Sequence, residues 1–488
     1  MADFGFVGAS YTAPSIYQND SECINFYPEI DITKQPGERG IVALYPTPGL
    51  VKELQLDNAA IRGMRTLSGG NIMLAVAGNK VYAIDRYIVA TFIGTLTTSK
   101  GQVSISDNVT TSDGLTAYIV DGVNRYTWVA ATSTFIQLPD SDGPWQGGTT
   151  VDVVDNYNVY SQGNSQLWAA TDLGSSLSTN QYFGSKDGSP DNLVALIVDH
   201  RQVYLLGEVT SEVWNDTGNV IAGIISFPFS RVPGTALQHG CAAKFSIARF
   251  SEQFMFVSKN TRGQVQIGAI VNYAFQRIST HAVENTLVGK AVDDAVAFTY
   301  QIEGHEFYVV TFPSIDLTWV YDLSTKAWHK WLCVDSKNQF HRHRANCMAA
   351  FQNQVFVGDY DNGKIYSLHQ DVYTDDGAII KRVRRAVHLT ADLQRQYFDE
   401  MQIQFQPGVG LQQGQGVNPQ AMLRWSNDGG STWSNEHWTI IGRIGKYLNR
   451  AIWRRLGWSR DRIFEVTVTD PIRCVIISAN LKATGGEN

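Results

Sequence analysis

The sequence predicts a mainly β protein: a β-propeller-like ring of six or seven blades, an irregular N-terminal arm and a C-terminal β-sandwich-like domain. Three observations predict this fold class. Apolar and aromatic residues alternate in short strands joined by Gly, Asn or Asp turns, similar hairpins recur along most of the chain, and the last part alternates over longer strands. Aromatic residues make up 11% of the sequence and the 43 glycines outnumber the 14 prolines, which suits short strands and tight turns.

The recurring unit is a β-hairpin. In residues 72–84, two strands flank Gly78 and Asn79, which stand where a tight turn needs a positive φ. The same pattern recurs at 115–128, 203–214, 305–321 and 355–367, with weaker copies at 165–170 and 252–266.

The spacing of these hairpins predicts a ring. With the weaker copies included, it approaches the roughly 40–50 residues of a four-stranded propeller blade. Each unit is too small to bury its own apolar face, so the units must pack against one another, and a ring does this with few open strand edges. The segment 304–331 ends in a strand, a turn and a strand with Trp328 and Trp331, a common blade pattern.

The two ends of the chain differ from the middle. Residues 1–50 are turn-rich, so we expect an irregular arm that wraps a neighbour or seals the ring. This segment contains Pro14, Pro28, Pro36, Pro46 and Pro48. The propeller-like domain then covers 51–380, and 381–488 form a separate basic β domain. Within it, the Gly/Gln-rich stretch 407–420 predicts a mobile loop.

Charge divides the chain in the same way. Residues 381–488 carry 15 Lys and Arg against 9 Asp and Glu, a net +6, whereas the remainder carries 24 against 37, a net −13. A solvated basic face is the simpler interpretation. The alternative is that the basic region meets an acidic partner or a DNA backbone. The residues assigned to such a DNA path or interface are Lys381, Arg382, Arg384, Arg385, Arg454 and Arg455.

The sequence also indicates a cellular context. The five cysteines are spread widely and form no CxxC pair, so we expect reduced thiols in a protein made in a cytoplasm. The N-terminal residues have no basic and apolar pattern of a signal peptide, and no apolar run reaches about 18 residues, so we expect no membrane segment.

One local motif resembles the Asp-box of sialidase propellers. It comprises Ser426, Asp428, Gly430, Thr432 and Trp433. Such a box closes a β-hairpin turn: the aspartate accepts turn N–H groups, glycine adopts a positive φ and the tryptophan packs beneath. A glycan-active or lectin-like propeller is the alternative function. Because only one box is present, it falls outside the propeller-like part and the sequence has no arginine-triad signature, we interpret it as a structural turn.

No catalytic or metal-binding set emerges from the sequence. His341 and His343 share one face of a strand, but two neighbouring arginines repel a cation and no third ligand is near. The carboxylate pairs at 293–294 and 375–376 lie on opposite faces of a strand or in turns. We therefore expect a protein that is not an enzyme and that uses no cofactor and no metal.

Several segments, in order, resemble the packaged-DNA stabilisation proteins of short-tailed bacteriophages, the tail hub or nozzle family. The resemblance covers most of the chain and depends on the order and spacing of its segments. They are 25–29 (NFYPE), 44–50 (LYPTPGL), 62–64 (RGM), 182–216, 240–241, 277–284, 442–443 and 449–462.

This resemblance implies a structural subunit that assembles as a hexameric ring below the portal–adaptor stack. Such a ring retains packaged DNA and later forms part of the conduit for genome ejection. It implies as partners the adaptor ring, fibre, spike or plug proteins, and double-stranded DNA that passes without sequence recognition. The protein would lie in the virion tail, after assembly in the host cytoplasm.

Overall fold

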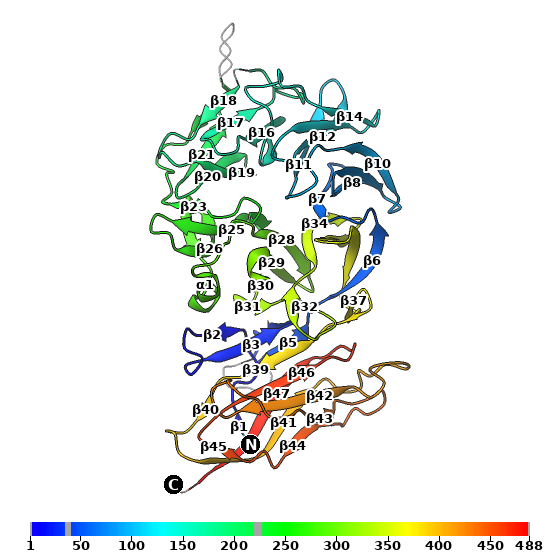
Figure 1. Cartoon of the computed structure of the whole chain (residues 1–488), viewed down its shortest axis with the longest axis vertical. Coiled ribbons are helices and arrows are strands. Elements are labelled where there is room, and N and C mark those ends of the chain that lie inside the picture. Colours follow the sequence, from blue (N-terminus) through cyan, green and yellow to red (C-terminus); the bar gives the residue numbers. More distant parts are fainter. Residues whose placement is uncertain (1, 35–40, 181, 219–226, 487–488) are drawn as a thin grey trace.

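The computed structural model describes residues 2–34, 41–180, 182–218 and 227–486. Seven blades form the propeller in this described part of the chain (Figure 1): five are separate sheets of four or five strands, and two are parts of larger sheets. In blade 1 the strands are β7 (Ile61–Thr66), β8 (Ile72–Ala77), β9 (Lys80–Asp85) and β10 (Ala90–Thr95). In blade 2 they are β11 (Ser104–Thr110), β12 (Gly114–Val120), β13 (Arg125–Val129) and β14 (Thr134–Gln137).

Blades 3 to 5 continue the same antiparallel order. Blade 3 has β15 (Val151–Val154), β16 (Tyr157–Ser161), β17 (Leu167–Ala170) and β18 (Phe183–Ser185). Blade 4 has β19 (Leu193–Asp199), β20 (Gln202–Gly207), β21 (Ser211–Asp216) and β22 (Phe229–Arg231). Blade 5 has β23 (His239–Cys241), β24 (Ala248–Phe250), β25 (Gln253–Asn260), β26 (Val265–Val271) and β27 (Ala274–Arg277).

The last two blades complete the ring. Blade 6 has β28 (Val296–Ile302), β29 (His305–Phe312), β30 (Leu317–Asp322) and β31 (Ala327–Lys330). Blade 7 has β34 (Ala345–Phe351), β35 (Gln354–Asp359), β36 (Lys364–His369) and, from the other end of the propeller, β6 (Gly49–Gln55). Because β6 pairs with β36 in antiparallel register, the first strand of the propeller closes its last blade.

The predicted propeller is confirmed, and the hairpins of the sequence are its central strands. The five strong hairpins form the two middle strands of blades 1, 2, 4, 6 and 7, and the weaker copies lie in blades 3 and 5. Seven apolar clusters fill the seven boundaries between neighbouring blades, including the one between blades 7 and 1. The blades thus bury one another's apolar faces, as a ring requires.

The C-terminal domain is a sandwich of two antiparallel layers. One sheet contains β1 (Ala2–Asp3), β4 (Phe26–Ile30), β5 (Val42–Pro46), β41 (Gln396–Phe405), β44 (Ala451–Arg454), β45 (Trp458–Ser459) and β47 (Ile476–Gly485). The other contains β2 (Tyr11–Thr12), β3 (Asp20–Ile24), β39 (Arg382–Arg385), β40 (Leu389–Thr390), β42 (Gln420–Ser426), β43 (His437–Ile440) and β46 (Asp461–Val468).

The N-terminal segment is more regular than the sequence suggested. Residues 1–50, expected as an irregular arm, supply five strands to the sandwich, and Phe6, Cys23, Phe26 and Leu44 lie in its apolar core. The prolines are compatible with pairing because Pro28 and Pro46 lie in two strands that face each other near a sheet margin. Pro36 lies outside the described residues.

Propeller and sandwich share one continuous sheet. Blade 6 continues from β31 through β3 and β39 into β46, β42 and β43 of the sandwich. Figure 1 accordingly shows β3 and β39 between the blades and the C-terminal strands. The connection is a bonded sheet rather than a bare linker.

The remaining elements are short. They comprise β32 (Leu332–Val334), β33 (Phe340–Arg342), β37 (Thr374–Asp375), β38 (Ala378–Ile379), a 3₁₀ turn at Pro313–Ile315 and helix α1 (His281–Leu287). The side chain of Thr280 accepts the Val283 N–H at the start of α1. Across the described residues, no helix has the length and apolar character needed to span a membrane. The Gly/Gln-rich loop 407–420 connects β41 to β42, and its mobility stays a prediction.

Candidate functional site

The basic strand of the sequence lies at the junction between propeller and sandwich. Strand β39 pairs with β3 on one side and β46 on the other, so it is an interior strand. Arg382 and Arg384 are two positions apart and therefore lie on the same face of the strand. On that face they are 0% and 2% exposed. The expectation that these two arginines line a DNA path is therefore wrong, because the sheet and its packing cover them.

Arg384 ties the N-terminal segment to the sandwich. Its guanidinium donates to the carbonyl oxygens of Phe6, Ala9 at 3.0 Å and Glu22 at 3.2 Å. Burial lowers the pKa of Arg384. A buried guanidinium requires such acceptors, so this side chain holds together two segments far apart in sequence.

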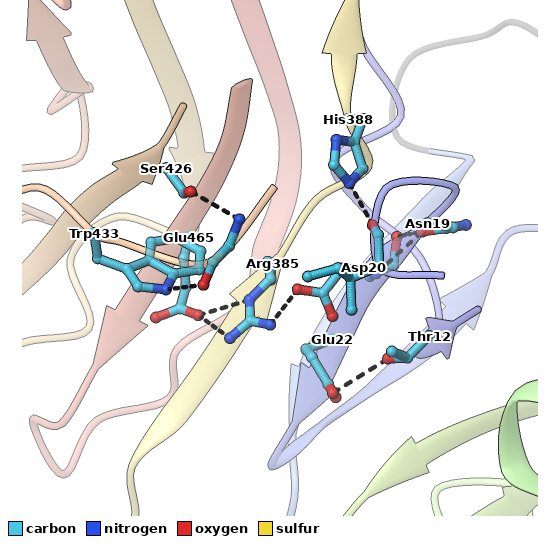
Figure 2. Close-up of polar contacts among 12 residues, drawn as sticks. Thr12, Asn19, Asp20, Glu22, Arg385, His388, Ser426, Trp433 and Glu465 are labelled. Carbon is cyan, nitrogen blue, oxygen red and sulfur yellow. Dashed lines mark hydrogen bonds and ion pairs between the residues drawn. The ribbon is translucent and has the colours of Figure 1, made fainter. Parts of the chain in front are cut away.

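Arg385 connects three strands through ion pairs. Its guanidinium contacts Asp20 of β3 and lies 2.8 Å from Glu465 of β46, and Arg424 of β42 donates to the other oxygen of Glu465 at 2.6 Å. Figure 2 shows Arg385 between the two carboxylates. Glu465 is only 2% exposed, so these partners offset the cost of burying its charge.

The Asp-box is a hydrogen-bonded turn beside this cluster. Asp428 accepts the Thr432 N–H at 2.8 Å and the Thr432 hydroxyl at 2.6 Å, and the Ser426 oxygen accepts the Gly430 N–H at 2.8 Å. The Thr432 hydroxyl, the Thr432 N–H and the Ser426 hydroxyl lower the pKa of Asp428 to about 2. The geometry is that of a turn closed by its own side chains.

The tryptophan of the box reaches the junction. Its indole lies 4.9 Å from the guanidinium carbon of Arg385 and 4.6 Å from that of Arg424, close enough for cation–π contact. Figure 2 shows Trp433 beside Arg385 and Glu465. The box thus packs against the strands that join the two domains, and we keep its structural role as our interpretation.

The other predicted basic residues divide between two environments. Lys381 is half-buried, with its ammonium 5.0 Å from the centre of the Phe340 ring, and it belongs to the junction. Arg454 and Arg455 are exposed on the sandwich, where Arg454 pairs with Glu400 at 2.7 Å. The six residues therefore do not form one surface.

Asn25 is a further connection at the junction. Its φ is +58° and it is completely buried, and its amide donates at 2.8 Å to the carbonyl oxygens of Leu332 and Lys381. Its side-chain oxygen accepts the Leu332 N–H at 2.9 Å. One asparagine therefore links the N-terminal segment, the segment after blade 6 and the start of β39.

A buried histidine forms a second contact between the domains. His305 of blade 6 lies 2.8 Å from Asp322 through Nδ1 and contacts Glu29 of β4 through Nε2. Burial alone would lower its pKa, but hydrogen bonds to Asp322 and Glu29 outweigh burial and raise the pKa of His305 to about 9. The charged imidazolium thus bridges a propeller carboxylate and a sandwich carboxylate.

The remaining candidates from the sequence do not converge. His341 is partly exposed and lies 2.6 Å from Asp316, whereas His343 is buried with its ring centre 3.7 Å from that of Trp331. Burial raises the pKa of Asp375 to about 7, although the positive charges of Arg382 and Arg344 act to lower it. Within the described part of the chain, no group of three or more His, Cys, Asp or Glu residues is arranged to hold a metal.

Solved structures offer only a weak likeness. The N-terminal domain of Nup159 matches 72% of this chain and 99% of its own at 11% identity and a TM-score of 0.40. The WD40 β-propeller domain of Doa1 matches 66% of this chain and 97% of its own at 10% identity and a TM-score of 0.39. A search of curated proteins gave no match.

Family models match both parts of the chain. The model described as "Bacteriophage P22 Gp10, beta-propeller" matches residues 20–373, and the model "Bacteriophage P22 Gp10, beta-sandwich" matches residues 381–484. The first match starts at residue 20 and therefore includes strands β3 to β5, which the structure places in the sandwich. The two matches cover nearly the whole length, and the chain belongs to the bacteriophage P22 Gp10 family.

Proposed function

We propose that this chain assembles as a hexameric ring below the portal–adaptor of a short-tailed phage, retains packaged DNA and forms part of the ejection conduit. The observation that carries the proposal is the pair of family matches, one for each domain. Membership of this family makes the chain a structural subunit of a phage tail and places it in the virion. The ring, the DNA contact and the conduit are the finer parts that we propose.

The fold suits a subunit that works by assembly. The shared sheet, Asn25 and His305 join the propeller to the sandwich, so force applied to one domain is transmitted to the other. We propose that the protein has no catalytic role. Its partners would be the adaptor ring and fibre, spike or plug proteins. The protein would bind them after its synthesis in the host cytoplasm.

Contact with DNA would be weak and independent of sequence. Arg382 and Arg384 are buried, so the members of the predicted basic set that are exposed to contact DNA are Arg454 and Arg455. Phosphate contacts of this kind weaken steeply as salt concentration rises. We do not pursue the glycan-active alternative, because the Asp-box turn packs on the domain junction and the family matches give it no support.

Electron microscopy of the purified protein and of phage particles tests the proposal. We expect a six-fold ring with an open centre below the adaptor. Particles made without the protein should package DNA and then lose it, as measured by nuclease-resistant DNA per particle. A stable monomer absent from the tail, or full DNA retention without the protein, would contradict the proposal.

A further inference from the structure

The loop between β43 and β44 presents an exposed surface that the tail function above does not explain. Residues 443–450 are all exposed, with Leu448 at 96%, Tyr447 at 66% and Ile444 at 49%. On β43, Trp438 and Ile440 are 56% and 48% exposed. Single exposed apolar side chains are ordinary, but five within eleven residues form a patch of the kind that marks an interaction site.

The same patch is strongly basic. Residues 437–450 contain three arginines and lysines and no aspartate or glutamate, a net charge of +3. Among the described residues, Arg443, Lys446 and Arg450 have no carboxylate partner within 4 Å. These three charges are therefore available to a partner of opposite sign.

The loop is held in shape before any partner binds. The side-chain amide of Asn449 donates to the carbonyl oxygens of Ile440 at 2.6 Å and Ile441 at 2.8 Å. Gly408 has φ +79°, and a Cβ there would come within 2.4 Å of the Tyr447 ring. The Gly-rich loop thus supports the aromatic side chain from beneath, and a preorganised surface loses less entropy on binding.

A groove adjoins the patch on the outer face of the sandwich. It has a volume of about 560 Å³, and its walls include Gln402, Gln404, Tyr447, Leu448 and Asn480. Strands β43 and β44 are the last members of their sheets in the described structure. The patch therefore covers the end of the sandwich, at the opposite end of the molecule from blades 2 and 3 (Figure 1).

Blades 2 and 3 have the complementary properties. Residues 101–190 contain nine aspartates and glutamates against two basic residues, a net charge of −7. Asp113, Asp140 and Asp187 are exposed and lie in the loops of these blades. The same blades expose apolar side chains at 44–62%: Val109, Val123, Ile136, Leu173, Leu177 and Phe183.

We infer that the 437–450 patch of one copy docks on blades 2 and 3 of the next copy, an inference that rests on the proposed ring. Opposite charges give the contact its orientation and rate, and the aliphatic and aromatic side chains supply the buried core. Leu448 and Ile444 gain nothing from a phosphate backbone, which favours a protein partner over DNA. Because patch and acceptor are different surfaces, each copy uses both, and such contacts close into rings when the rotation permits.

Charge reversal on the full chain tests this contact. The patch variant is R443E/K446E/R450E, and the acceptor variant is D113K/D140K/D187K. The control R262E/K290E/K337E makes the same charge change as the patch variant at three exposed propeller residues without ion pairs in the described structure. A second pair compares L448S with L393S, an exposed sandwich leucine at 68%. Circular dichroism verifies folding, and sedimentation velocity measures association at low and high salt.

We expect wild-type association to weaken with salt, and each reversal variant to weaken it about tenfold or more while both controls leave it unchanged. Mixed together, the patch and acceptor variants should bind each other, since the reversed charges match. If the patch variant associates like the wild type, or the two variants fail to pair, the inference is overturned and the proposed ring stands. If the wild type never self-associates, both the contact and the self-assembled ring are overturned.

Discussion

The propeller and the sandwich are both antiparallel β structures, but they are assembled from the chain in opposite ways. Blades 1 to 6 each consist of strands consecutive in sequence, and one strand, β6, comes from elsewhere to close blade 7. The sandwich combines residues 2–46 with residues 382–485, so every contact between these parts spans the whole propeller. The propeller is thus local in sequence, and the sandwich depends on the two ends of the chain meeting.

This difference predicts that the N-terminal segment is essential to one domain alone. Deleting residues 2–24 removes β1, β2 and β3, takes Phe6 and Cys23 from the sandwich core and breaks the shared sheet. We expect the sandwich to lose cooperative unfolding and the propeller to keep its own transition, because β6 is retained. Calorimetry and limited proteolysis measure this, with a stable fragment near residues 49–370 as the expected product.

This expectation would be contradicted if the deletion variant showed a single calorimetric transition at a lower temperature than the wild type. It would mean that the propeller also needs the junction to fold. The matched deletion is 477–486, which removes nearly all of β47 from the sandwich without cutting the shared sheet. We expect this deletion to lower sandwich stability and to leave the junction contacts of Arg384 intact.

The same difference explains what could be predicted from the sequence. The five strong hairpins lie within blades because both of their strands and the turn are adjacent in sequence, and periodicity reports such neighbours directly. The role of residues 1–50 could not be predicted in this way. Their partners lie more than 300 positions away, as in the Glu22–Arg385 pairing, and no local pattern encodes such a register.

The second prediction concerns the charged cluster at the junction. Glu465→Gln removes the carboxylate that Arg385 and Arg424 share, and Glu465 is 2% exposed. Leaving two arginines without this partner should lower the free energy of unfolding by about 2–3 kcal/mol, less than a fully buried pair because both arginines are partly exposed. Urea unfolding followed by tryptophan fluorescence measures the change.

The exposed pair between Arg454 and Glu400 is the control for this variant. Their side chains are 67% and 18% exposed, so solvent screens the attraction. Glu400→Gln should therefore cost about 0–1 kcal/mol. Equal losses for the two variants would show that the junction cluster has no special role in stability.

The third prediction uses pH to separate the domain contacts. The pKa of His305 is raised to about 9 from the 6.5 of an unfolded chain, so its stabilisation is complete below pH 6.5 and is lost as pH rises through 9. Compared with His305→Gln, the wild type should be more stable by roughly 1–3 kcal/mol at pH 6 and nearly equal at pH 10. Urea titrations across this range measure the difference.

His200 serves as the matched control in the propeller. It lies 2.9 Å from Asp199, but its side chain is 63% exposed. His200→Gln should therefore leave the pH dependence of stability unchanged. A wild-type advantage over His305→Gln that is independent of pH would contradict a charged bridge and favour a packing role instead.

The basic strand shows where residue type alone misleads. Lys381, Arg382, Arg384 and Arg385 look like a solvent or DNA surface in one dimension, yet the structure uses them as internal connections. Val383, which is 3% exposed, was the available sign that this strand lies inside the fold. The His305 bridge had no such sign, since Glu29 and His305 are 276 positions apart.

The smallest expected effect belongs to the Asp-box. Asp428→Asn keeps the size of the side chain but removes the charge that accepts the Thr432 hydroxyl and N–H. Because Asp428 is only partly buried, we expect a small fall in the unfolding temperature of the sandwich and none in that of the propeller. The pKa of Asp428 is lowered to about 2, so its contribution is complete above pH 3.8 and is lost as pH falls through 2.

Calorimetry at pH 7 measures the change, with the exposed Asp392→Asn on the same domain as control. A fall in the unfolding temperature of the propeller would mean that the loss of the turn also destabilises the junction, through the contact between Trp433 and Arg385.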